Sequence, residues 1–167
     1  MAYEIVGETI KSATSIKIGE IFKVATGQVD DKGNPIYTYP KRYKENVTKQ
    51  TYPNFHIIQV LLTPTPKGIG NGRVQLEYLV NVQYRVAENT ETISNLQQRL
   101  DEVGLKLCAE LTELDLERPT KIYNSYYEKA DGVLQFFFNI KVFAIPQKPE
   151  EQKMRILEQE INLKEEN

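Results

Sequence analysis

Residues 74–86 carry the clearest strand pattern of the chain. Apolar side chains occupy every even position, and polar residues fill the odd positions except for Leu79. The apolar set is Val74, Leu76, Tyr78, Val80, Val82, Tyr84 and Val86. Alternation with a period of two predicts an antiparallel strand with one face on the core. Residues 55–63 (FHIIQVLLT) predict a second strand, and residues 64–72 (PTPKGIGNG) predict a flexible hairpin tip between the two.

A second hairpin is predicted towards the end of the chain. Residues 120–130 and 133–145 read as two strands, and Asp131-Gly132 between them is typical of a tight hairpin turn. The second strand contains Phe136, Phe137 and Phe138 in succession. A strand with one wet face should alternate, so two interpretations stay open. Either both faces of this strand are buried inside the monomer, or one face is covered by another protein.

An amphipathic helix is predicted over residues 3–24, where Val6, Ile10 and Ala13 recur at helical spacing. Gly27 and the polar segment 30–35 (DDKGNP) should end this element with a turn. The tyrosine-containing segment that follows, residues 36–50, predicts a short exposed strand or an extended arm.

A second helix should begin near residue 93, with Asn89, Thr90 or Ser94 as its N-cap, and Ser94 has capping-box spacing to Gln97. Its apolar positions alternate steps of three and four: Ile93, Leu96, Leu100, Val103, Leu107, Leu111 and Leu114. Pro119 bars its continuation. We expect this stripe to pack on Val80, Val82 and Tyr84, with Cys108 as a small hydrophobe beside it.

The predicted order of elements indicates an α+β fold, an antiparallel sheet with helices packed on one face. One domain is expected over residues 1–147. Residues 148–167 predict a charged amphipathic helix or tail with Met154, Leu157 and Ile161 on one side. The net charge of −2 gives no general attraction to nucleic acid or anionic membrane, and the single cysteine cannot form an internal disulfide. With no membrane span and no signal peptide in view, we expect a soluble cytosolic chain.

Charge is unevenly distributed along the chain. Residues 32–73 contain seven basic residues and one acid, whereas residues 91–117 contain seven acids and two basic residues. Two solvated faces of opposite sign would explain this, and so would head-to-tail contact between copies of the chain. The candidate interface residues are Lys41, Arg42, Lys44, Lys67, Arg73, Asp101, Glu102 and, from the aromatic strand, Phe137.

No catalytic, cofactor or metal site is predicted. The glycines at 68, 70 and 72 precede a strand, whereas a phosphate-binding loop opens a helix. His56 is the only histidine and has no companion ligands, and Cys108 lies on an apolar helix side that disfavours a thiolate. The aromatic and basic segment 37–44 (YTYPKRYK) could stack bases, but a protein interface fits it better. We therefore expect a protein that is not an enzyme.

Two segments resemble the signatures of a known family. Residues 42–58 (RYKENVTKQTYPNFHII) are similar to the first signature of the tail terminator proteins of long-tailed phages and of phage-tail-like particles of Gram-positive bacteria. Residues 131–139 (DGVLQFFFN) resemble the second signature, an Asp-Gly-Val-Leu turn that enters an aromatic strand. Both occur in the family's order with the helix between them, so the resemblance covers residues 1–146.

The resemblance implies a small α+β subunit that assembles as a ring, usually a hexamer, in the virion or particle tail. Such a ring caps the tail tube, stops tube polymerisation and offers a surface to the head or neck. The implied partners are further copies of the chain, the tail tube protein and the head or neck connector, with the tail sheath as a further candidate. No cofactor, membrane or sequence-specific nucleic acid is implied. A neck connector, a tube-associated protein, or a non-viral adaptor for a small ligand or peptide stays open as an alternative.

Overall fold

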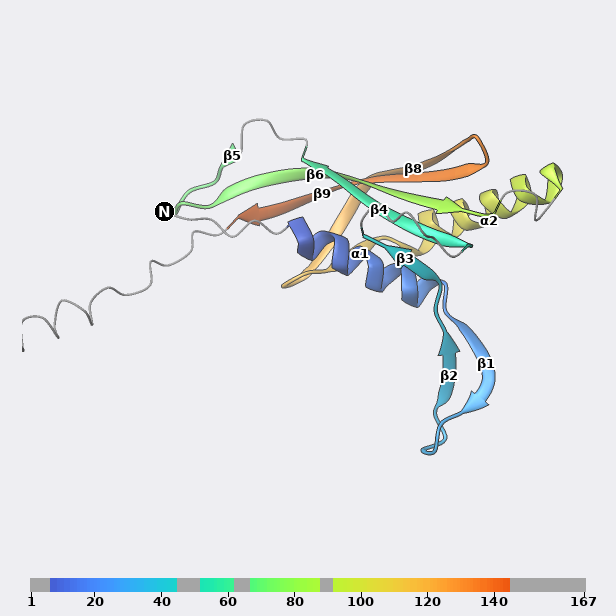
Figure 1. Cartoon of the computed structure of the whole chain (residues 1–167). Coiled ribbons are helices and arrows are strands. Elements are labelled where there is room, and N and C mark those ends of the chain that lie inside the picture. The colour runs from blue at the N-terminus through green and yellow to red at the C-terminus, as the bar shows by residue number, and fades with distance from the viewer. Residues whose placement is uncertain (1–6, 45–51, 62–66, 88–91, 145–167) are drawn as a thin grey trace, which may run out of the picture.

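The computed structural model describes residues 7–44, 52–61, 67–87 and 92–144 (Figure 1). Two helices and nine strands follow one another in these ranges. In chain order they are α1 (Gly7–Ile21), β1 (Val24–Val29), β2 (Pro35–Thr38), β3 (Lys41–Tyr43), β4 (Asn54–Leu61), β5 (Lys67–Gly68), β6 (Val74–Arg85), α2 (Ile93–Glu110), β7 (Glu113–Asp115), β8 (Pro119–Ala130) and β9 (Val133–Ala144). The predicted α+β class is confirmed, and most of the fold is sheet.

Seven strands form the main sheet in the order β3-β4-β6-β9-β8-β7, with β5 paired to one end of β6. All neighbours are antiparallel except β3 and β4, which run parallel. The prediction of a purely antiparallel sheet is therefore wrong at this edge. Residues 45–51, which lie between β3 and β4 in the chain, fall outside the described part. The remaining pair, β1 and β2, forms a separate two-stranded sheet.

The long central strands carry the predicted alternation. Along β6 the even positions from Leu76 to Tyr84 are buried and the odd positions are half-buried. Strand β9 repeats the pattern, with Phe136 and Phe138 fully buried and Phe137 half-buried between them. Because β6 and β9 pair over eleven residues, their buried positions fall on one face of the sheet. The three phenylalanines are thus divided between two faces.

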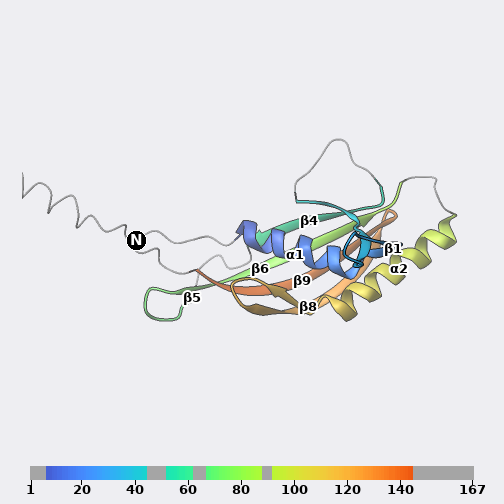
Figure 2. The ribbon, with the colours of Figure 1, turned by 90° about the horizontal axis from the view of Figure 1, so that it is seen from below.

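Both helices lie against that buried face, as Figure 2 shows from below. Helix α1 packs on β4 and β7, and α2 packs on β8 and β9. The expectation that α2 covers Val80, Val82 and Tyr84 of β6 is corrected: its main contacts are one and two strands further along the sheet. All three residues belong to the same core as Leu100 and Leu107.

Several predicted boundaries of the helices are wrong. Helix α2 ends at Glu110, and the continued apolar spacing belongs to Leu111, the C-cap, and Leu114, which lies in β7. Pairing of β7 with β8 accounts for the change from helix to strand. The N-cap is Thr92, whose side chain accepts a hydrogen bond from the Asn95 N–H at 3.4 Å, so Ser94 lies inside the helix. Asn89 and Thr90 fall outside the described residues.

The first helix ends at Ile21, before the predicted residue 24. Gly27 does not terminate it but lies within β1 at φ 78°, while the predicted turn at residues 30–35 joins β1 to β2. The predicted helix or tail at 148–167 lies outside the described residues.

The predicted turn at Asp131-Gly132 is confirmed. The predicted tip at residues 64–72 is confirmed for residues 69–72, whereas Lys67 and Gly68 form β5 and residues 64–66 lie outside the described part. Asp131 and Gly132 have φ values of 52° and 73°, the pair of left-handed conformations that a two-residue hairpin requires. At the glycine-rich tip, Gly70, Asn71 and Gly72 also have positive φ, and the Arg73 N–H donates to the Gly70 carbonyl at 3.0 Å. These glycines form a hairpin tip between β5 and β6.

Candidate assembly surfaces

Strands β1 and β2 form an arm that projects from the body of the molecule (Figure 1). We use the word arm for residues 24–38. Every residue of both strands is exposed, and among the described elements β1 and β2 pack extensively only on each other. Tyr37 stands opposite Ala25, and Pro35 stands opposite Val29. Since Pro35 and Tyr37 are two residues apart, these four side chains share one face of the arm.

The tip of the arm is ordered by Asp30. One of its carboxylate oxygens accepts the N–H groups of Lys32 at 2.9 Å and Asn34 at 2.8 Å, and the other accepts the Asn34 side-chain amide at 3.1 Å. The hydrogen bonds from Asn34 hold the pKa of Asp30 below its usual range. The tip therefore carries the negative charge of Asp30, with Asp31 and Lys32 exposed beside it.

The base of the arm is held by Lys23. Its ammonium group forms a 2.7 Å ion pair with Glu20 of α1 and lies 4.6 Å from the centre of the Tyr37 ring. These contacts join the base of the arm to the end of α1. They do not involve the tip.

Two of the predicted basic interface residues are used within the subunit. The Arg42 Nη1 donates to the Ser15 carbonyl of α1 at 2.9 Å, and a Cβ at Gly19 would collide with the Arg42 guanidinium. Lys44 donates to the Ser12 hydroxyl at 3.1 Å. Arg42 and Lys44 thereby attach β3 to α1, whereas Lys41 is exposed at the sheet edge.

At the end of the main sheet where β6 begins, the chain forms a half-open groove of about 700 Å³. Its walls come from the β5–β6 tip, the segment between β7 and β8, and the end of β9: Ile69, Arg73, Leu116, Glu117, Arg118, Pro119, Thr120, Lys141, Val142 and Phe143. Three cations and one acid line it. The Arg118 guanidinium lies 5.4 Å from the centre of the exposed Phe143 ring. We call this feature the basic groove.

The predicted basic residues therefore do not form one patch. Strand β3 pairs with the start of β4, which pairs with Arg85 at one end of β6, while Lys67 and Arg73 lie at the other end. Eleven residue steps of about 3.3 Å separate these ends by on the order of 35 Å. Lys67 is exposed on β5, and Arg73 lines the basic groove.

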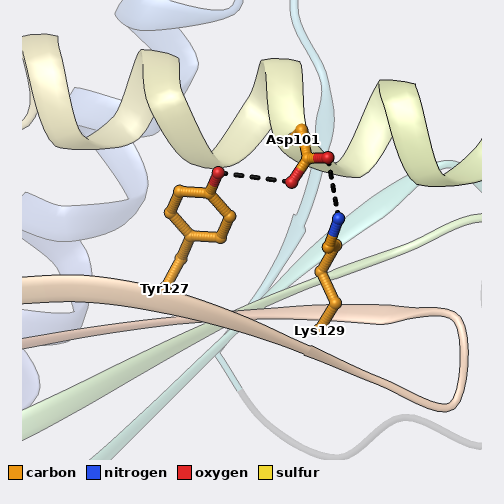
Figure 3. A network of polar contacts seen from close by, with 3 residues as sticks. All are labelled: Asp101, Tyr127 and Lys129. Atoms are coloured by element: carbon orange, nitrogen blue, oxygen red, sulfur yellow. Dashed lines mark hydrogen bonds and ion pairs between the residues drawn. The ribbon is translucent and has the colours of Figure 1, made fainter.

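The predicted acidic residues lie on α2, where Asp101 is engaged within the subunit (Figure 3). It accepts hydrogen bonds from the Lys129 ammonium at 2.7 Å and from the Tyr127 hydroxyl at 3.2 Å. The Lys129 hydrogen bond, opposed in part by desolvation, holds the pKa of Asp101 below its usual range. Gly104 leaves room for the Tyr127 ring, which a Cβ would approach to 2.7 Å. Glu102 is exposed and accepts from Gln98 at 3.0 Å.

The uncovered face of the sheet carries Phe137. Its ring stacks on Tyr126 of β8 at 5.1 Å between centres, and the Tyr126 side chain is 52 % exposed. The same face carries the Asn139–Glu77 hydrogen bond of 3.0 Å between β9 and β6. No helix of the described residues packs on this face. What partly shields Phe137 from solvent is the ring of Tyr126.

The two groups that the sequence offered for chemistry, His56 and Cys108, are both removed from full contact with solvent. His56 is nearly fully buried next to the Tyr43 ring, and burial, together with the charge of Arg85, lowers its pKa. Burial raises the pKa of the partly buried Cys108 thiol. Within the described ranges no cluster of three potential metal ligands occurs, and no helix there is long and apolar enough to cross a membrane.

Comparison with known families decides the identity. A family model described as phage tail terminator protein matches residues 36–152, which is more than half of the chain. This chain belongs to the phage tail terminator family. The match contains both segments on which the resemblance was based, residues 42–58 and 131–139. A search of curated proteins found no match.

Membership of the family assigns the chain a structural role in the phage tail, as a component of the virion. The match begins inside β2, so α1 and β1 lie before it.

Sequence reasoning missed the basic groove because its walls are brought together from residues 69–73, 116–120 and 141–143. The only local hint of this groove was the charged run Glu117-Arg118 directly before Pro119, beside the position where a strand was predicted to begin.

Proposed function

We propose that the protein forms a ring, a hexamer as in its family, that caps the finished tail tube and stops tube polymerisation. The observation that carries this proposal is the tail terminator family match over residues 36–152. The exposed arm and the basic groove support it, because each is a surface that a neighbouring molecule can cover.

The physical requirement is an asymmetric ring. A tube grows because each ring exposes the surface that the next ring covers, which is an open heterologous series. Ending the series requires one face that accepts the tube and one that rejects a further tube ring. On this proposal the partners are the tail tube protein on one face and the head or neck connector on the other, with the sheath as a partner in a contractile tail.

Charge contributes to this assembly in the proposal. Lys41, Lys67 and Arg73 are exposed, and so is Glu102 on α2, so all four are available to a neighbour. Attraction between exposed charges weakens as salt rises, so we expect the rings to weaken with ionic strength. Arg42, Lys44 and Asp101 have partners inside the subunit, so substituting them would disturb the fold as well as the ring.

The test is deletion of the gene from its phage or particle genome, with the gene supplied on a plasmid as the control. We expect heads and baseplates to be made, and tails of irregular and excessive length that fail to join heads. Electron microscopy of the lysate measures the tail lengths. Tails of normal length that still fail to join heads would contradict the terminator role and favour a neck connector.

A further inference from the structure

The arm is an exposed hairpin that contact with another molecule would stabilise. A two-stranded hairpin alone is marginally stable in water. Here one face carries Val29, Pro35 and Tyr37, all exposed, and the tip carries two acids, Asp30 and Asp31, and one base, Lys32. The arm therefore presents an apolar face that ends in a tip where acids outnumber bases by two to one.

The basic groove has the complementary properties. Its cations, Arg73, Arg118 and Lys141, outnumber its single acid Glu117, and its apolar wall includes the exposed Ile69 and Phe143. An acidic tip that enters this groove would meet opposite charge, and an apolar strand face behind the tip would meet apolar side chains. Such charge complementarity sets the register of a contact and disfavours wrong partners.

The arm of a subunit does not reach the groove of the same subunit. The arm leads into β3 at the Arg85 end of β6, and the groove lies at the Val74 end, on the order of 35 Å away. A six-residue strand spans about 20 Å, and the arm points away from the sheet in Figure 1. An arm can therefore fill a groove only in a second copy.

We propose that the arm of each subunit inserts into the basic groove of the next copy of this chain. The tip acids pair with Arg73 and Arg118, and the apolar face of the arm packs on Ile69 and Phe143. The two surfaces are different, so the contact is heterologous and passes from copy to copy until it closes a ring. This inference deepens the proposed function, since it rests on the ring and names the contact that builds it.

The first experiment compares two valines of the arm in the purified full-length protein. Val29 is 63 % exposed on the apolar face of the arm, and Val24 is 66 % exposed at its base, opposite Thr38. We expect Val29→Asp to weaken self-association about tenfold or more, as loss of a central contact does. Val24→Asp should leave it close to wild type. Sedimentation at micromolar concentration measures both, and unchanged unfolding midpoints show that both variants fold.

The decisive experiment mixes two variants, each of which lacks one of the two proposed contact surfaces. The double variant Arg73→Glu with Arg118→Glu keeps the arm but loses the groove, and Val29→Asp keeps the groove but loses the arm. Each alone should be monomeric. Mixed in equal amounts, they should form heterodimers and nothing larger, because each pair retains one intact arm and one intact groove.

Three outcomes would overturn the proposal: a wild-type chain that is monomeric, assembly like wild type by Val29→Asp or by the double variant Arg73→Glu with Arg118→Glu, or a mixture that stays monomeric. A further variant, Leu157→Asp, tests a different occupant of the groove. If Leu157→Asp loses assembly while Val29→Asp keeps it, residues 145–167, and not the arm, occupy the basic groove. These measurements use purified protein without a tube, so a failed arm contact leaves the tail-length test of the proposed function standing, and the reverse also holds.

Discussion

The two faces of the main sheet show what determines burial in this protein. On the helix-covered face, Phe136 and Phe138 are fully buried in one core with Leu100 and Ile140. On the uncovered face, Phe137 comes from the same strand and is half-buried against an exposed tyrosine. Three identical neighbours thus have different environments, because a strand directs successive side chains to opposite faces and only one face has helices on it.

Substitution of Phe138 should have the largest effect. Phe138→Ala removes a fully buried ring and leaves a cavity that the surrounding strands cannot fill, at a cost of about 3–5 kcal/mol in unfolding free energy. Phe137→Ala, the matched control one residue earlier, should cost about 1 kcal/mol, the scale of a stacked aromatic pair. Denaturant unfolding measures both. Equal costs would mean that the Phe137 face is covered as well.

The same contrast can be tested across α2 with two leucines. Leu100 is fully buried, whereas Leu105 on the outer side is 61 % exposed. Leu100→Ala should lower the unfolding free energy by about 2–5 kcal/mol, and Leu105→Ala should change it by less than about 0.5 kcal/mol. An unfolding midpoint unchanged by Leu100→Ala would show that α2 does not cover the core.

The close approach of α2 to β8 predicts an intermediate effect. Gly104→Ala places a Cβ 2.7 Å from the Tyr127 ring, and the overpacking should cost about 1–3 kcal/mol. This exceeds the gain of up to about 1 kcal/mol that alanine brings to a helix interior. Gly68→Ala is the control, because nothing lies within 4 Å of its Cβ. Stabilisation by Gly104→Ala, measured by thermal unfolding, would mean that Tyr127 moves away freely.

The smallest effect should come from Asp101 and depend on pH. Its pKa in the folded protein is held below the unfolded value, so it stabilises the fold above the unfolded pKa and loses this contribution as pH falls through the folded pKa. Asp101→Asn should therefore be less stable than wild type at neutral pH, and the two should converge below about pH 4. Glu102→Gln, one residue away, serves as control. A difference from wild type that is independent of pH would assign the loss to packing.

Local patterns predicted much of the fold. The alternation of β6, the Asp131-Gly132 turn and the glycine-rich tip needed only the period of a strand and the φ values that glycine and Asp adopt. The end of α2 could not be predicted in this way. Leu111 and Leu114 continue the helical spacing, but the pairing of β7 with β8, which local spacing does not encode, takes Leu114 into a strand.

The candidate surfaces divide in the same manner. The sequence predicted an exposed strand or extended arm over residues 36–50, which overlaps the arm of the structure only at residues 36–38. Strand β3 belongs to the main sheet, and residues 45–50 lie outside the described part. The sequence also identified Arg73 and Phe137 among the interface candidates. Tertiary structure decided that Arg42 and Lys44 bind α1 and that Asp101 binds Lys129. It also decided that segments far apart in the chain, containing Arg73, Arg118 and Phe143, form one groove. The physical reason is range: turn and strand patterns act over a few neighbouring residues, whereas ion pairs and grooves depend on which distant segments the sheet brings together.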